Sequence, residues 1–419
     1  MSLILRWIAG VCSALPLLSS AAAAAEPVQH VDAMACKQCH EEIYAQWSGS
    51  MHANSSALKD PIHGAFYKNV IGDPLQEGVT KKGKAPVCLK CHAPVAAMDK
   101  KTKLDAKPAY AAGVSCTTCH SFSKFKGTDT EDGKPLYGTD AYEMDPNSLY
   151  GPSGISYTTE RTPEDAKWPT PVHHPVPIQG NKSDLFKSND VCMGCHEKRS
   201  NPHGTPLCRT GNEYRSAKNF VSCQACHMSI VTVPKMKDGV VVPGETVSIA
   251  DHSMAGGHDD KMITRGIALS METQREGDTI KATLTVRNRL PHAYPTGAPF
   301  RNFFIRIATY DKDGKMLWKN YQVHPIKDDP KAAFWYTLGD EAGKPTSPPK
   351  ATQVLSDTRL KPNEERTLEY EIPVEPGTSI VRAEALYDLM LPPIKAKMKG
   401  KLPDELLTPR LAASAEVRL

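Results

Sequence analysis

The chain has 419 residues, which is enough for about two or three domains of roughly 150 residues each. Its formal net charge of +4 is too small to predict an acidic partner, and we expect no contact with nucleic acid. No stretch beyond the N-terminal 25 residues approaches the roughly 20 apolar residues of a membrane helix, so we expect no transmembrane segment.

Residues 1–25 have the pattern of a cleaved signal peptide. A positive charge at Arg6 precedes an apolar core at residues 8–18, and the alanine run 21–25 supplies small residues for cleavage. Cys12 lies in this leader and is lost with it. We therefore expect a soluble mature protein in the periplasm, outside the cell or on its surface.

Ten of the twelve cysteines fall into five pairs of one type, each separated by two residues and followed directly by histidine. C-x-x-C-H is the attachment motif of c-type haem. Two thiols on one helical turn add to the two vinyl groups along one porphyrin edge, and the histidine offers its imidazole to the iron as the proximal ligand. The motif residues are Cys36, Cys39 and His40; Cys88, Cys91 and His92; Cys116, Cys119 and His120; Cys192, Cys195 and His196; and Cys223, Cys226 and His227.

Thioredoxin-like thiol pairs and zinc sites are the alternatives for C-x-x-C, but neither explains a histidine after every pair. We therefore predict five covalently bound haem c groups, each holding iron. This part of the chain is poor in long apolar runs and rich in Pro, Gly and Lys, so its core must be largely porphyrin. We expect short helices at the motifs, joined by irregular chain.

The spacing of the motifs predicts how the haems group. The second and third motifs begin 28 residues apart and the fourth and fifth 31 apart, whereas the first stands 52 residues before the second. We expect two close haem pairs, the second with the third and the fourth with the fifth, and one leading haem.

The second axial ligand of each iron decides between an electron carrier and a catalyst. Ten histidines lie outside the motifs, and five are needed for complete bis-histidine ligation. We leave out His292, in a loop of the next domain, and also His30 and His324, which have the pattern of surface histidines. The distal candidates are His52, His252, His258, His174, His173, His203 and His63.

His52 is the first of these candidates. Residues 36–50 have the periodicity of one helix, with His40, Tyr44 and Trp47 on a common face. His52 would lie about 18 Å further along that helix than His40. It can therefore reach a neighbouring haem, but not the far side of the ring that His40 holds.

From about residue 262 the pattern changes to period-two alternation, and residues 311–314 give a hairpin turn. This predicts an all-β, immunoglobulin-like antiparallel sandwich in residues 259–419, after a mainly helical and irregular haem domain in residues 26–258. The sandwich could pack over haem edges, dock a partner or supply a ligand. The expected strands are 263–272, 279–287, 302–310, 316–323, 352–360, 366–374 and 380–389.

Two further features each allow two interpretations. Cys208 lies outside the motifs and the leader; Arg209 would favour a reactive thiolate there, whereas burial would leave an inert thiol. Lysines crowd around the second motif, where they could steer an acidic redox partner or form a solvated surface. These lysines are Lys81, Lys82, Lys84, Lys90, Lys100, Lys101, Lys103 and Lys107.

The segment that begins at the first motif resembles a known family. The run from Cys36 to His40, followed by Trp47, Ser50 and His52, resembles the start of multihaem cytochromes related to the tetrahaem electron acceptor of hydroxylamine oxidoreductase. The resemblance covers nearly all of the haem domain. It implies haems stacked in pairs as a wire, with the histidine at the position of His52 ligating another haem. The chain departs from that family by its fifth motif and its β-domain.

Two comparisons with other multihaem cytochromes follow from this resemblance. The segment 291–297, followed by Arg301, is similar to β-domains that trail many bacterial multihaem cytochromes. Pentahaem nitrite reductases commonly use lysine in place of the motif histidine at their catalytic haem. All five motifs here end in histidine, which argues against that activity.

The sequence therefore predicts a cytochrome that transfers electrons through closely packed haems to redox partner proteins, other multihaem cytochromes among them. We assign no catalytic residue. One alternative is an enzyme that reduces or oxidises a small nitrogen or sulfur species at one five-coordinate haem, with Arg209, Tyr214 and Arg215 near it. Another is a homo-oligomer, or a subunit of an extracellular cytochrome filament.

Overall fold

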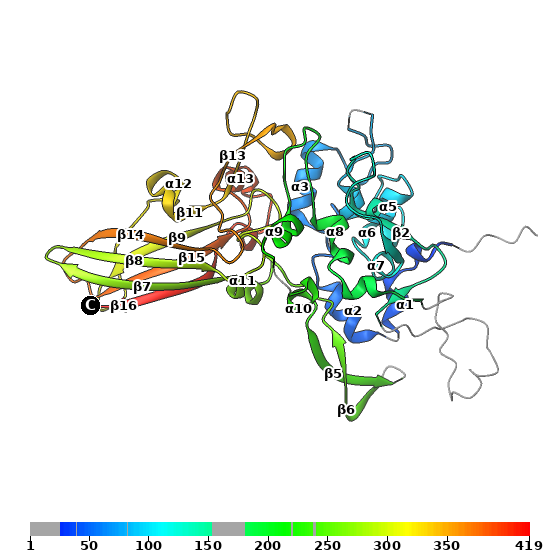
Figure 1. The fold of residues 1–419 in the computed structure, drawn as a ribbon, viewed down its shortest axis with the longest axis horizontal. Helices are drawn as coiled ribbons and strands as arrows, with labels where there is room; N and C mark the ends of the chain where they lie inside the picture. The colour runs from blue at the N-terminus through cyan, green and yellow to red at the C-terminus, as the bar shows by residue number, and fades with distance from the viewer. Residues whose placement is uncertain (1–25, 39, 82, 153–180, 219–220, 238–239) are drawn as a thin grey trace, which may run out of the picture.

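The chain forms two regions, a helical region up to residue 266 and an elongated β region from residue 267, which lie end to end (Figure 1). The described part holds no helix that is long and apolar enough to cross a membrane. The computed structural model describes residues 26–38, 40–81, 83–152, 181–218, 221–237 and 240–419.

The helical region consists of short helices, and several begin at a side chain that caps them. Ser115 and Ser222 stand directly before the first cysteine of the third and fifth motifs, and their hydroxyls accept hydrogen bonds from the backbone N–H groups of Thr118 and Ala225. These caps satisfy free N–H groups of the first turn, so each helix begins at the cysteine. The helices are α1 (Ala33–Lys37), α2 (Glu41–Ser48), α3 (Pro61–Val70), α4 (Leu89–His92), α5 (Pro94–Met98), α6 (Pro108–Ala111), α7 (Cys116–His120), α8 (Asp190–His196), α9 (Thr210–Ser216), α10 (Cys223–His227) and α11 (Asp260–Gly266).

Residues 36–50 do not form the single helix that the sequence predicts. α1 and α2 are separate, because His40 has φ −120° and ψ 48°, outside the helical range. The common face is preserved beyond the break, where the rings of Tyr44 and Trp47 lie 5.6 Å apart. The indole N–H of Trp47 donates to the carbonyl of Val114 (2.9 Å), which ties α2 to the segment before the third motif.

The helical region also contains strands where the sequence predicts irregular chain. They are β1 (Phe122–Phe125), β2 (Tyr142–Met144), β3 (Tyr150–Gly151), β4 (Asn181–Lys182), β5 (Ile230–Lys237) and β6 (Val240–Ala250). β3 pairs with β4 in parallel, whereas β1 with β2 and β5 with β6 are antiparallel. The hairpin of β5 and β6 is rich in β-branched residues, which favour extended chain, and it projects from the body of the molecule (Figure 1).

The β region contains two larger antiparallel sheets. Its elements are β7 (Ile267–Glu276), β8 (Thr279–Asn288), β9 (Asn302–Tyr310), β10 (Met316–Lys319), α12 (Pro325–Asp328), β11 (Ala333–Phe334), β12 (Tyr336–Gly339), β13 (Gln353–Asp357), β14 (Glu365–Pro373), β15 (Ile380–Asp388), α13 (Pro392–Met398) and β16 (Arg410–Arg418). One sheet has the order β10–β9–β15–β16, with β11 also paired to β9, and the other has the order β14–β8–β7. Every second residue of β8 and β14 is more deeply buried, so each strand turns one face inward.

The predicted antiparallel β region is confirmed, with differences at its start and at strands β11, β12 and β16, which the sequence did not predict. The strand expected at 263–272 is wrong at its start, because α11 occupies that stretch and is capped by Asp259, whose carboxylate accepts from the N–H of Met262 (2.7 Å). The short strand β12 was not expected. β16 was not expected either, because its alanines and serine give little contrast between the two faces.

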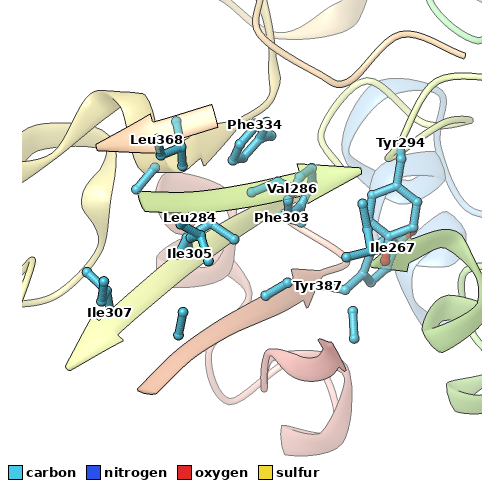
Figure 2. Packing of buried hydrophobic residues seen from close by; sticks show 14 of the residues in the cluster. Ile267, Leu284, Val286, Tyr294, Phe303, Ile305, Ile307, Phe334, Leu368 and Tyr387 are labelled. Atoms are coloured by element: carbon cyan, nitrogen blue, oxygen red, sulfur yellow. The ribbon is translucent and has the colours of Figure 1, made fainter. Parts of the chain in front are cut away.

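The β core is one connected cluster of aliphatic and aromatic side chains. Figure 2 shows side chains of β8 and β9, among them Leu284, Phe303 and Ile305, gathered between the strands. The rings of Phe303 and Phe334 stack with centres 4.1 Å apart, and both side chains are fully buried. Burying one such side chain stabilises the fold by about 1.5–3 kcal/mol, so the β region can hold itself together.

The two regions contact each other directly. The side-chain amide of Asn201 donates to the carbonyls of Pro348 (2.8 Å) and Ala351 (2.6 Å). The ring of Phe66, on α3, stacks on Phe300 with centres 5.0 Å apart. Residues of the β region can therefore take part in a site that belongs mainly to the helical region.

Candidate haem-binding site

One large cavity gathers the five motifs. Its volume is about 2340 Å³, more than twice that of the roughly 300–1,000 Å³ pockets that hold ordinary small ligands. Every described motif cysteine and motif histidine lines it, and Cys39 lies outside the described residues. The cavity thus has room for several large groups between the motifs.

The described cysteines of the motifs are free thiols. Burial raises the pKa of Cys88 and of Cys119 to about 11, so both thiols are protonated near neutral pH. The described motif thiols are not joined as disulfides, so they are available to hold a cofactor covalently.

Thiols from different motifs meet in the cavity and show which motifs are neighbours. The first motif adjoins the third, the second adjoins the fourth, and the fourth adjoins the fifth. These contacts place the thiols of the first motif beside the third and those of the second beside the fourth, while the pairing of the haems themselves stays a prediction. Distance along the chain misleads because the chain folds back: the N–H of Val114 donates to the carbonyl of His52 (2.8 Å). The thiols that interact across motifs, each shifting the pKa of the other, are Cys36 with Cys116, Cys91 with Cys195, and Cys192 with Cys223.

Three motif histidines each face a histidine from elsewhere in the chain. Two imidazoles that share one metal ion at roughly 2 Å each have ring centres roughly 6–6.5 Å apart. The observed separations match this value, so these residues fit a haem iron between them. The facing rings are His196 and His52 (6.1 Å, interplanar angle 75°), His120 and His252 (6.5 Å, 21°), and His227 and His292 (6.5 Å, 23°).

Backbone carbonyls fix the orientation of several of these rings. Nδ1 of His120 donates to the carbonyl of Tyr150 (2.6 Å), and Nδ1 of His227 donates to that of Ala255 (2.6 Å). Nδ1 of His252 likewise donates to the carbonyl of Ala250 (2.7 Å). A ring held by Nδ1 leaves Nε2 free as a ligand, which is the usual arrangement around metal-binding histidines.

Burial favours the neutral, metal-binding form of the facing pair His52 and His196. Desolvation lowers the pKa of His196 to about 3 and that of His52 to about 4. Nδ1 of His52 is buried and has no hydrogen-bond partner among the described residues. A buried polar atom of this kind is costly unless something else occupies the space beside the ring.

His63 lies beside a motif histidine rather than opposite one. Its ring centre is 4.1 Å from that of His92, too close for an iron between the two. Nδ1 of His63 (2.8 Å) and Nδ1 of His92 (3.1 Å) both hydrogen-bond to the carbonyl oxygen of Ser55. The two rings therefore lie side by side at one acceptor. His63 therefore does not share an iron with His92, and its role as a distal ligand of another haem stays a prediction.

The remaining histidines do not face a motif ring among the described residues. His258 lies in the cavity wall, and desolvation, with smaller contributions from Arg301 and Arg410, lowers its pKa to about 4. His203 is exposed in a turn. His173 and His174 lie outside the described residues.

The two histidines expected at the surface are partly buried instead. His30 bonds to Asp99 (3.1 Å), and His324 caps α12 and packs on Phe304 with ring centres 4.5 Å apart. Neither lies in the wall of the cavity.

The polar groups near the motifs are largely engaged with each other. Nε of Arg209 donates to the side chain of Asn212 (3.0 Å), and Nε of Arg215 donates to that of Glu197 (2.8 Å). Burial raises the pKa of Cys208, which favours the inert thiol. Four of the lysines near the second motif form ion pairs, which reduces the positive surface there: Lys90 with Asp140, Lys101 with Glu77, Lys103 with Asp105, and Lys107 with Glu26.

His292 faces a motif histidine, although the sequence analysis left it out of the distal-ligand candidates. Its position in a loop of the β region argued against a role in the helical region. The signal that could have found it is the segment 291–297, with its two prolines and its similarity to the β-domains of other multihaem cytochromes.

Known proteins agree with this geometry. Residues 35–121 match the family described as cytochrome c554 and c-prime. No curated protein matches the chain. Among solved structures, the penta-heme cytochrome c552 from Thermochromatium tepidum is similar, with 41% sequence identity and a TM-score of 0.83 over 94% of this chain and 100% of that chain. The chain therefore belongs to the multihaem c-type cytochromes, which carry covalently bound haem c.

Proposed function

We propose that the chain is an exported penta-haem cytochrome that transfers electrons. The observation that carries this proposal is the set of three facing histidine pairs, with ring centres 6.1–6.5 Å apart, in the cavity that the five motifs share. Two imidazoles on one iron leave no position for a substrate, so bis-histidine ligation favours electron transfer over catalysis.

The facing pairs serve as axial ligands for the third, fourth and fifth motifs. When bound, haem iron supplies the one-electron redox chemistry. The polypeptide positions the rings through their Nδ1 bonds, keeps the imidazoles neutral by burial and holds each porphyrin edge through two thiols. His40 and His92 are the proximal ligands of the first and second motifs, whose distal candidates are His258, His203, His173 and His174.

The fourth motif lies at the centre of the network. It adjoins the second and fifth motifs through thiol contacts, and Cys119 of the third motif interacts electrostatically with both of its cysteines. The phenol of Tyr142 supports this junction, because it accepts from the N–H of Gly194 (2.9 Å) and donates to the carbonyl of Val191 (2.9 Å). The contacts of the first motif with the third then connect all five motifs into one network that branches at the fourth motif.

The wider setting follows from the sequence. The leader pattern of residues 1–25 supports export to the periplasm or the cell surface. We expect redox proteins, including other multihaem cytochromes, as partners. Two antiparallel sheets around one core support an immunoglobulin-like sandwich as the class of the β region.

The number and attachment of the cofactors test the proposal directly. The mass of the mature protein should exceed that of its polypeptide by five haem groups, and all ten motif cysteines should resist alkylation after denaturation. A colourless protein with the mass of the bare polypeptide would overturn the proposal.

An enzyme acting on a small nitrogen or sulfur species is the second candidate, because of one observation. His63, the described histidine nearest to His92, lies beside it and leaves the other side of its iron to another group. Low-spin electron paramagnetic resonance signals from every haem would favour the carrier. A high-spin signal from one haem, with carbon monoxide binding to about one haem per chain after reduction, would favour the enzyme.

A further inference from the structure

The distal partner of the fifth motif comes from the β region. His292 lies between β8 and β9, and its ring faces that of His227 on α10 at 6.5 Å. Nδ1 of His292 donates to the carbonyl of Ala293 (3.0 Å), so Nε2 is free. The ligation of this iron therefore depends on how a loop of one region sits on a helix of the other.

The β region holds its own side of this loop rigidly. Asn288 is fully buried at the end of β8, and its side-chain amide donates to the carbonyls of His292 (2.8 Å) and Lys361 (2.8 Å). Tyr294 and Leu360 exchange two backbone hydrogen bonds of 2.9 and 3.1 Å. These bonds fix the shape of the loop, but they do not fix its position against the helical region.

Glu213, on α9, provides the contact from the helical region. Its Oε2 accepts from the N–H of Ala293 (3.2 Å) and from the hydroxyl of Thr296 (2.6 Å), on either side of the cis-bonded Pro295. The hydroxyl of Thr210, also on α9, lies 2.8 Å from that of Thr296. The carboxylate thus holds the loop at the residue that directly follows His292.

Arg359 completes the clamp from the β side. Its Nη1 donates to Oε1 of Glu213 (2.8 Å) and to the carbonyl of Pro295 (3.3 Å). Two further bonds of 2.8 Å join its guanidinium to both oxygens of Asp357. The side chains of Arg359 and Glu213 are only 14% and 13% exposed. A buried charge pair with this many hydrogen bonds is geometrically specific, and loss of one partner leaves the other charge uncompensated.

We propose that Glu213 and Arg359 are positioning residues that hold His292 on the iron of the fifth motif. Docking of the β region then sets the ligation of that iron, and loss of the clamp opens it. This inference rests on the proposed function, because it assumes a haem between His227 and His292.

Spin state and ligand binding test the clamp without any assay of activity. His292→Ala gives the reference state, in which we expect a high-spin signal from about one more haem than in the wild type, and about one more carbon monoxide bound per chain after reduction. Glu213→Gln and Arg359→Met should move at least half of that haem to the same state. Added imidazole should restore the low-spin signal in all three variants, because it can take the iron position that His292 vacates.

Two further variants separate positioning from general loss of stability. Glu384→Gln removes the charge that pairs with Arg306 (2.7 Å) between the neighbouring strands β15 and β9, away from the clamp. This variant should leave the spin state at the wild-type value. Arg359→Lys keeps the positive charge but loses the planar guanidinium that bonds to Asp357 and Glu213 at once. It should give a smaller high-spin fraction than Arg359→Met. The haem count from the mass should stay the same in every variant.

The two ideas fail in different ways. If His292→Ala leaves the spin state and carbon monoxide binding unchanged, the ligand assignment in the proposed function is wrong. If His292→Ala opens one haem but Glu213→Gln and Arg359→Met retain the wild-type spectrum, the clamp alone is wrong. The clamp is also wrong if Glu384→Gln has the same effect as the clamp variants, because the change would then reflect destabilisation of the β region.

Discussion

The helical region and the β region are stabilised in different ways. In the β region most buried side chains form one large cluster, with a small second one at Tyr336, Leu338 and Ala351, whereas in the helical region they form only small clusters around the cavity. Cavity-lining side chains lose the contacts that a packed core would give them. The difference indicates that haem c is part of the core of the helical region, whereas the core of the β region is made by its own side chains.

The largest effect is expected from removing one haem attachment site, which should unfold the helical region and leave the β region folded. Cys192→Ser combined with Cys195→Ser removes attachment at the fourth motif, which adjoins the second, third and fifth. We expect the helical region to lose its folded structure, because the missing cofactor would leave the centre of the cavity unfilled. Limited proteolysis followed by mass spectrometry should then yield a surviving fragment close to residues 267–419.

Cys208→Ser is the matched control, since this half-buried cysteine belongs to no motif. It should keep every haem and the wild-type resistance to proteolysis. If the double variant lost one haem and resisted proteolysis in both regions, the fourth motif would not be the centre of the fold.

The second effect concerns the core of the β region. Phe303→Ala should lower the free energy of unfolding by about 3–5 kcal/mol, because the side chain is fully buried against Phe334 and its removal leaves a void. Urea unfolding followed by circular dichroism measures the change. Val323→Ala, at a side chain that is 89% exposed, should stay within about 0.5 kcal/mol of the wild type. A loss below about 1 kcal/mol at Phe303 would mean that the β core tolerates the void.

The sequence alone predicts the contrast between a helical region that binds haem and a β region with an apolar core, because both features leave local patterns. Haem attachment depends on a spacing of five residues, and strand burial depends on alternation, so both are local patterns that need no knowledge of the fold. The alternation in β8 and β14 was visible for that reason. The prediction for His52 used the same local reasoning, because its distance from His40 excluded the same haem, and the ring of His52 faces that of His196.

The contacts between distant segments could not be predicted in this way. The neighbours of each motif depend on how the chain folds back, as the bond between Val114 and His52 illustrates. His292 was left out because it follows β8 in the other region, and only the docking of the two regions brings it opposite His227. α11 was missed because the cap at Asp259 outweighs the weak alternation of the residues after it.

A smaller effect on the free energy of unfolding is expected from the N-caps of the motif helices in the helical region. Ser115→Ala and Ser222→Ala each remove an N-cap from a motif helix, and each should cost about 1 kcal/mol in the free energy of unfolding. Ser48→Ala, at an exposed serine near the end of α2, is the control and should cost less. If the cap variants match the control, the covalently bound cofactor fixes these helices without help from the caps.

The smallest effect is a dependence of the β region on pH. Burial, with Lys395 adding to it, lowers the pKa of His324 from 6.5 to about 4. Between these values the unfolded chain binds more protons than the folded chain, so stability is lost as the pH falls from 6.5 towards 4. Because the ring is partly exposed, solvent screening should limit the loss to about 1 kcal/mol.

His324→Asn isolates this effect, because asparagine can still cap α12 but does not titrate. The difference in unfolding free energy between pH 7 and pH 5 should be smaller in the variant than in the wild type. Val323→Ala, at the exposed neighbour, should keep the wild-type dependence. If the wild type and His324→Asn lost the same stability, the acid sensitivity would lie with other groups, and the β region would be as indifferent to pH as its apolar core suggests.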